Sequence, residues 1–152
     1  MNVIWLYLDK KAAAAKALQD YDKMKYVLEH TDEEISRVYS QMEGVGSPNL
    51  DGMPHAHNPQ ACEDRAIKGI EEIDVLRERF RQAQEYMAWF QPAWDALSED
   101  DRYTLDTFYH DQEYGTGAAD TVASYFGIER ASAYRKKARA LDNLTTLLYG
   151  RW

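Results

Sequence analysis

Apolar residues recur at alternating steps of three and four along two long stretches of this chain, and this spacing constrains the fold more than any other feature. Six of eight repeat positions are apolar in the first stretch: Leu18, Tyr21, Lys25, Leu28, Asp32, Ile35, Tyr39 and Met42. The second stretch carries Ile67, Ile70, Ile73, Leu76, Phe80, Ala83, Met87 and Phe90. Such steps place side chains on one face of an α-helix, so both stretches are predicted to be long amphipathic helices.

The first helix is expected from about Ile4 to Glu43. Thr31–Glu34 has the form of a capping box, so a new helix start near His30 is an open alternative. The apolar opening, residues 1–8, is too short to span a bilayer and lacks the basic leader of a secretion signal. We interpret it as the first buried turns of this helix and expect no membrane association.

A loop rich in glycine and proline, residues 44–58, separates the two helices. Asn58 followed by Pro59 is a strong helix start, because asparagine caps free N–H groups and proline lacks the N–H that would remain unpaired there. Pro92 is expected to end or kink the second helix, because a helix interior needs the donor that proline lacks. The two helices predict a long antiparallel hairpin arm over residues 1–92.

Residues 93–152 are expected to form a second domain of short helices. These helices run from Ser98, which begins a capping box, to about His110, over Ala118–Phe126, and from Arg130 to about Leu148. Gly127 lies where the turn between the last two needs a positive φ, and Ala123 is small enough for them to cross closely. Val122, Phe126 and Ile128 have the spacing that packs them together. This pattern is typical of a helix-turn-helix.

Positive charge is concentrated on the last of these helices, although the whole chain carries a net charge of -8. Residues 128–141 contain five Lys or Arg side chains against Glu129 alone. Phosphate binding depends on local charge, so this stretch is a candidate duplex-binding surface. Ala133 and Ala138 are expected on its inward face, and the stem of Lys136 has to cover apolar surface. The candidate DNA-binding residues are Arg130, Ser132, Tyr134, Arg135, Lys136, Lys137 and Arg139.

No stretch has a convincing strand pattern, so the fold class is predicted to be all-α. Apolar residues make up 45% of the chain, which is enough for a packed core. The single cysteine, Cys62, excludes an intrachain disulfide and favours a reducing, cytoplasmic location. Basic residues near a helix end also complement the helix dipole, and a structural three-helix bundle shares the glycine turn. Two alternatives to DNA binding therefore stay open: basic residues that only complement the helix dipole, and a three-helix bundle with a purely structural role.

Residues 97–144 resemble region 4 of bacterial sigma factors. The likeness rests on the acidic cap, the helix containing Phe108 and Tyr109, the TVASYFGI turn and the ER.SAYR....AL..L helix. This part is still more similar to the sigma-like end of phage late-gene activators of the RinA/ArpU type, and the loop over residues 47–54 is similar to related prophage proteins. The resemblance implies a cytoplasmic, prophage-encoded regulator of late transcription. It places Arg130, Ala131, Tyr134 and Arg135 toward bases, and Lys137 and Arg139 nearer phosphate.

These observations predict a sequence-specific transcriptional regulator that binds double-stranded DNA. A homodimer is expected because two half-sites combine their affinities, and the arm sets half-site spacing or contacts RNA polymerase. A small-terminase-like packaging protein is the nearest alternative, and it would form a ring of many subunits. A helical protein-interaction adaptor is the alternative from another class, and it need show no salt-dependent duplex binding.

No enzyme, cofactor or metal site is predicted. The chain has no P-loop, nucleophile-elbow or dinucleotide-binding glycine pattern. His55, His57 and Cys62 have the right chemistry for a soft metal, but a fourth ligand is absent and the trio straddles a helix start. The aromatic cluster of Trp89, Phe90 and Trp94 is expected to be core where the arm meets the second domain.

Overall fold

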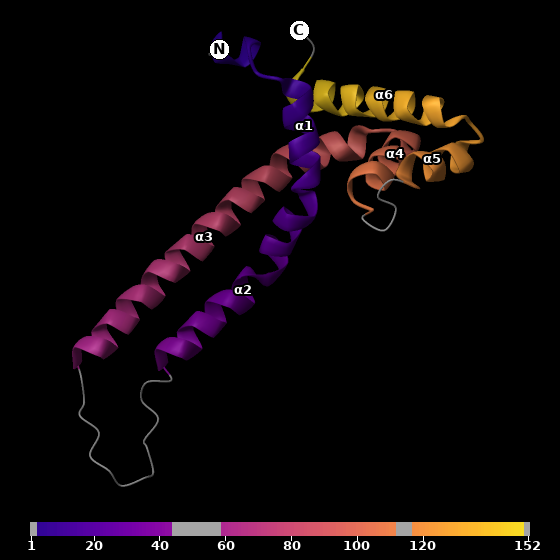
Figure 1. Cartoon of the computed structure of the whole chain (residues 1–152). Coiled ribbons are helices and arrows are strands. Elements are labelled where there is room, and N and C mark those ends of the chain that lie inside the picture. The colour runs from indigo at the N-terminus through magenta and orange to yellow at the C-terminus, as the bar shows by residue number, and fades with distance from the viewer. Residues whose placement is uncertain (1–2, 44–58, 112–116, 151–152) are drawn as a thin grey trace. The chain divides into compact units, whose positions relative to one another are not determined.

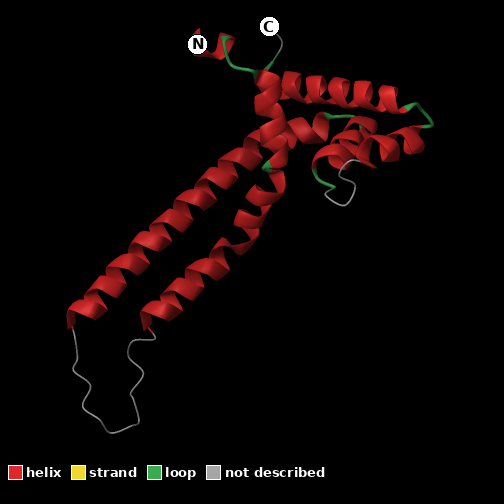
Figure 2. Ribbon diagram, in the orientation of Figure 1, coloured by secondary structure: helices red, strands yellow, loops and turns green. Residues whose placement is uncertain are grey.

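The protein is all-helical, as its apolar spacing predicts (Figures 1 and 2). The computed structural model describes residues 3–43, 59–111 and 117–150. Within these ranges no strand is present, and no helix has the length and apolar character needed to cross a bilayer. The elements are η1 (Val3–Leu6), a 3-10 helix, followed by α1 (Lys10–Gln19), α2 (Tyr21–Glu43), α3 (Pro59–Ala96), α4 (Glu99–Tyr109), α5 (Ala118–Phe126) and α6 (Arg130–Tyr149).

The first predicted helix is divided in two in the structure. The Asp9 side chain accepts a hydrogen bond from the Ala12 N–H at 3.0 Å and so caps α1, which begins later than expected. Asp20 separates α1 from α2. The alternative break near His30 is wrong, because α2 continues through that residue. The opening apolar side chains were expected to be buried, but they are exposed: Val3, Ile4, Leu6, Tyr7 and Leu8.

α3 runs past Pro92 to Ala96, so of the expected end or kink at this proline, the end is wrong. A proline inside a helix costs about 3 kcal/mol, whereas each large apolar side chain that becomes buried contributes about 1.5–3 kcal/mol. Phe90, Ala93 and Leu97 are buried on either side of the proline. Their packing outweighs the missing donor. The N-cap predicted for this helix, Asn58, lies outside the described residues.

The chain divides into two compact units, residues 1–24 with 86–152, and residues 25–85. The sequence placed a single boundary between residues 92 and 93, with all N-terminal residues in the arm. In the structure α1 instead belongs to the unit that contains α4, α5 and α6. The reason is apolar packing, since Ala14 and Leu18 of α1 are completely buried in the core of that unit.

The larger of the apolar clusters described for the first unit is formed by α1, the end of α3, α4 and α6. Its buried members are Ala14, Leu18, Phe90, Ala93, Leu97, Leu105, Ala140, Leu141 and Leu144. Of the expected aromatic cluster, Phe90 is fully buried and Trp94 packs against this core, whereas Trp89 is 40% exposed. Aromatic burial at the end of α3 is therefore confirmed in part.

Side chains from distant parts of the sequence bind the last carbonyl groups of α1. The Tyr86 hydroxyl donates a hydrogen bond to the Ala17 carbonyl oxygen. His110, the C-cap of α4, donates from Nε2 to the Leu18 carbonyl oxygen at 2.6 Å. These carbonyls have no partner within α1 once the helix ends at Gln19, so the two donors stabilise that end.

The second unit, residues 25–85, has a small core between α2 and α3. Its buried members are Val38, Ile73 and Leu76, with Ile35 and Met42 packed against them. Met42 lies across Gly69, where an added Cβ would overlap the Met42 sulfur. Because Gly69 has no side chain, the Met42 side chain packs directly against the backbone of α3 at this position.

The apolar stripe predicted for α3 is only partly buried in this unit. Ile73, Leu76 and Ala83 are buried, as their spacing indicates. Ile67 and Ile70 are 49% and 54% exposed. The first turns of the stripe thus remain in contact with solvent.

Candidate nucleic-acid interface

α5 and α6 are joined by a tight turn whose backbone conformation favours glycine. Gly127 has φ 64° and ψ 40°, in the left-handed region. A Cβ at this position would meet nothing within 4 Å, so the requirement is conformational rather than steric. The Ile128 N–H donates to the Ala123 carbonyl at 2.9 Å, which satisfies one of the last carbonyls of α5. The positive φ predicted for Gly127 is confirmed.

A second apolar cluster holds α6 against α4 and α5. Its buried members are Ala119, Val122, Ala123 and Ala133, and the side chains packed against them are Tyr103, Phe108, Phe126 and Ile128. Three of the four buried residues are alanines, which allow the helix backbones to approach closely. The inward positions predicted for Val122, Phe126, Ile128 and Ala133 are therefore confirmed.

The face of α6 turned away from this cluster carries arginines and alanines. Its exposed residues are Arg130, Ala131, Tyr134, Arg135, Ala138 and Arg139. The inward position expected for Ala138 is wrong, because five residues of helix rotate it about 140° away from Ala133. The inward face continues instead through Ala140 and Leu144, both fully buried.

Two of the predicted DNA-binding lysines lie on aromatic rings instead of standing free. The Lys136 ammonium is 4.1 Å from the centre of the Phe126 ring, and its stem is half-buried, as expected. The Lys137 ammonium lies 5.0 Å from the centre of the Phe108 ring and 5.1 Å from that of Tyr109. Lys137 was expected on the outward face, but cation–π contacts keep it half-buried at the flank of α6. Ser132 is also half-buried.

Arg130 is held at the start of α6 by two neighbours. Its side chain hydrogen-bonds to Tyr134, and its Nε lies 3.7 Å from Oδ1 of Asp120 in the first turn of α5. The Tyr134 hydrogen bond and the Asp120 charge raise the pKa of the guanidinium above its usual range. Sequence reasoning missed Asp120, because an acid in the first turn of a helix is an ordinary complement to the helix dipole. The role of Asp120 depends on its closeness in space to Arg130, which lies ten residues later in the sequence, and the sequence alone does not give that distance.

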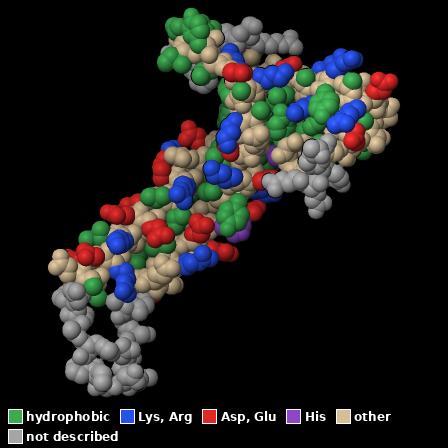
Figure 3. All heavy atoms as spheres, viewed as in Figure 1, with side chains coloured by type: hydrophobic (Ala, Val, Ile, Leu, Met, Phe, Trp, Pro, Cys, Tyr) green, Lys and Arg blue, Asp and Glu red, His purple; other side chains and the backbone are tan. Residues whose placement is uncertain are grey.

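Charge on the visible face is mixed but locally basic near α6. Figure 3 shows Lys and Arg side chains over α6, with acidic side chains beside them where that helix begins. The N-cap of α6 is Glu129, whose side chain makes no capping hydrogen bond. The start of α6 therefore combines exposed cations with backbone N–H groups that its N-cap side chain does not occupy, and both features suit an anionic ligand.

The residues considered as metal ligands fall only partly within the described chain. His55 and His57 lie outside it, and Cys62 is a half-buried free thiol in α3. In residues 3–43, 59–111 and 117–150, no group of three His, Cys, Asp or Glu side chains is placed to hold a metal ion.

Comparison of the chain with known proteins does not assign a function to this surface. No protein-family profile, no curated protein and no solved structure matches the chain.

Proposed function

We propose that this protein is a sequence-specific DNA-binding transcriptional regulator, of the phage late-gene activator kind that residues 97–144 resemble. In this proposal α5 and α6 act as a helix-turn-helix, and α6 enters the major groove of double-stranded DNA. The observation that carries the proposal is the line of Ala131, Arg135, Ala138 and Arg139 exposed on α6, opposite the buried Ala133.

The pattern of side-chain size along this line suits a groove. The major groove is about 12 Å wide and admits one helix if the contacting face is narrow. Ala131 and Ala138 keep that face narrow, and Arg135 between them has the length to reach a guanine edge. Asp142, one turn beyond, pairs with Lys11 at 3.0 Å. Its charge limits the proposed contact to the first turns of α6, where helix-turn-helix proteins read bases.

The proposed roles of the side chains follow from their surroundings. Arg130, Tyr134 and Arg135 are assigned to base recognition, and Arg130 is oriented in advance by Asp120. Arg139 is assigned to phosphate. Lys136 and Lys137 lie at the flanks of α6, which would face the phosphates on either side of the groove.

The proposal includes a homodimer in the cytoplasm and a contact with RNA polymerase. A single short recognition helix gives modest affinity, and two copies on adjacent half-sites combine their contributions. The exposed apolar side chains of Val3, Leu6 and Tyr7 favour a protein partner, because such groups are usually covered.

The same exposed segment favours a second candidate function, a helical protein-interaction adaptor that binds no nucleic acid. Its apolar side chains and the net charge of -8 suit contact with another protein. Duplex binding separates the two functions, because an adaptor requires none.

Fluorescence anisotropy of a labelled duplex over a range of salt concentrations tests the proposal. We expect the logarithm of the binding constant to fall linearly with the logarithm of salt concentration. The double variant Arg135→Ala/Arg139→Ala should lower affinity for a selected duplex, by about 1–3 kcal/mol for a lost base contact, and reduce the slope by about one for a lost phosphate contact.

The matched control is Lys25→Ala/Arg65→Ala, which removes the same charge from exposed positions of the second unit. It should bind as the wild type does. Equal affinities for both double variants, or binding that does not depend on salt, would refute the proposed role of α6.

A further inference from the structure

The second unit, residues 25–85, leaves more of its large apolar side chains exposed than it buries in the part that the structure describes. Its buried large apolar residues are Val38, Ile73 and Leu76. Those between 45% and 55% exposed are Tyr26, Tyr39, Ile67, Ile70 and Val75. Apolar burial is the main favourable contribution to folding and association, so this unit gains stability from a partner that covers one of its faces.

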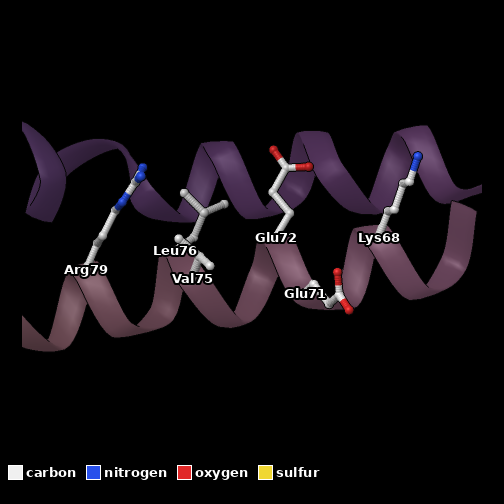
Figure 4. Close-up of a pocket in the computed structure, with 6 residues that line it drawn as sticks. All are labelled: Lys68, Glu71, Glu72, Val75, Leu76 and Arg79. Carbon is white, nitrogen blue, oxygen red and sulfur yellow. The ribbon is translucent and has the colours of Figure 1, made fainter.

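One such face has two neighbouring shallow hollows that share Glu72, Leu76 and Arg79, and together they are called the groove. The first hollow lies on α3 and has a volume of about 340 Å³; it is lined by Lys68, Glu71, Glu72, Val75, Leu76 and Arg79. The second has a volume of about 260 Å³ and lies between α3 and α2, where it reaches Glu34 and Arg37. Figure 4 shows Lys68, Glu72 and Arg79 directed toward α2, and Glu71 directed away, with Val75 and Leu76 between the charged residues. The groove thus has an apolar centre between opposite charges.

Glu72 and Arg79 have no ion-pair partner among the residues that the structure describes. Elsewhere on α3, Arg81 pairs with Glu78 at 2.7 Å and with Glu85 at 3.0 Å. Glu72 and Arg79 are two helical turns apart, about 10 Å along the axis, which is too far for them to pair with each other. Both charges are therefore available to an external partner.

We propose that two copies of this chain associate through the groove, with their α3 helices antiparallel and a two-fold axis between Val75 and Leu76. Glu72 lies three residues before Val75, and Arg79 lies three residues after Leu76. A two-fold rotation about that axis sets Glu72 of each copy opposite Arg79 of the other, with the exposed Val75 of each copy close to the axis. A symmetric dimer requires this self-complementary order of charges. The inference concerns the dimer alone and holds whether or not α6 binds DNA.

Light scattering and sedimentation of the full chain over a concentration series measure dimerisation. Variants in which the charges of Glu72 and Arg79 are reversed or exchanged test the proposed pairing. The wild type should dimerise. Glu72→Arg alone and Arg79→Glu alone each place like charges opposite one another twice, so each should raise the dimer dissociation constant by about tenfold or more. An equimolar mixture of these two variants should form a heterodimer, because each copy then carries the charge that the other needs. The double variant Glu72→Arg/Arg79→Glu should dimerise with itself and not with the wild type.

Asp74→Arg and Arg77→Glu are the matched controls, since they make the same charge changes on α3 at exposed positions that do not line the groove. Both should dimerise as the wild type does. The proposal is overturned by a wild type that stays monomeric at every concentration, by a mixture of the single variants that stays monomeric, or by dissociation of either control. If either single variant fails to fold, the double variant decides in place of the mixture, because it restores the charge order within one chain, and a double variant that stays monomeric overturns the proposal.

Discussion

Replacing His110 by alanine tests the contacts that hold the end of α1 against the end of α4. Nδ1 of the ring lies 2.7 Å from Oδ1 of Asp106, and Nε2 lies 2.6 Å from the Leu18 carbonyl oxygen. The centres of the Tyr21 and Trp94 rings lie 6.0 Å and 6.2 Å from that of the imidazole. The side chain is only 15% exposed. His110 is therefore a partly enclosed link between two helices of the first unit.

The protonation state of His110 follows from its partners. A carboxylate and a carbonyl both accept hydrogen bonds, so both ring nitrogens donate only when the imidazole is protonated. The hydrogen bond to Asp106 raises the pKa of His110 above 6.5, against the effect of burial and with help from the Leu18 carbonyl and the charge of Asp22. A pKa raised in the folded state gives a stabilisation that is complete below about pH 6.5 and is lost as pH rises through the folded pKa.

The size of the effect follows from the two hydrogen bonds. A hydrogen bond to a charged group contributes about 1.5–3 kcal/mol, and truncation also removes the side-chain donor of the Leu18 carbonyl, which then keeps only the Asp20 N–H. Asp106 is 54% exposed, so solvent screening reduces its share to about 1 kcal/mol or less. We expect His110→Ala to lower the free energy of unfolding by about 2–4 kcal/mol in mild acid, and by less at alkaline pH.

Urea unfolding followed by tryptophan fluorescence, to which Trp94 beside His110 contributes, measures this difference at about pH 5.5 and about pH 8.5. His30→Ala is the control, because His30 bonds only within α2, to the Tyr26 carbonyl, and stacks on the Tyr26 ring. Its effect should stay within about 0.5 kcal/mol at both pH values. A loss of stability by His110→Ala that is near zero in acid, or that does not change with pH, would show that protonated His110 does not link the two helices.

Two further substitutions test the packing of the first unit. Gly127→Ala should destabilise the protein by about 1–2 kcal/mol because φ is 64° there, whereas Gly117→Ala, at φ -88°, should be nearly neutral in the same thermal melts. Equal melting temperatures for the two variants would contradict the conformational role of Gly127. Leu105→Ala should cost about 2–5 kcal/mol, since Leu105 is completely buried, and Leu147→Ala, at 45% exposure, should cost much less in urea unfolding. Similar losses for the two leucines would contradict the described core.

Caps and turns, which depend on residues close together in the sequence, predicted the C-terminal helices well. The Ser98 side chain accepts a hydrogen bond from the Asp101 N–H at 3.2 Å, as the capping box indicates. The predicted bounds of Ala118–Phe126 agree with α5, and Gly127 has the expected positive φ. Caps and turns of this kind depend on residues within a few positions, so sequence alone reveals them.

Features that depend on distant residues were missed. α1 ends at Gln19, where Tyr86 and His110, 69 and 92 residues away from their carbonyl partners, bind the last turn. The helix continues through Pro92 because side chains of other elements bury the surrounding residues. Lys137 lies over rings supplied by α4, which no spacing within α6 indicates. In each case tertiary packing decides between conformations that local sequence leaves open.

The most direct test of the proposed function is a titration of the isotope-labelled protein with a duplex oligonucleotide, followed by backbone amide NMR signals. We expect the largest shifts in residues 130–139 of α6 and smaller shifts at the start of α5 near Asp120, and we expect added salt to reverse them. Signals that stay unchanged at low salt, or shifts confined to residues 25–85, would contradict the claim that α6 carries the DNA-binding surface.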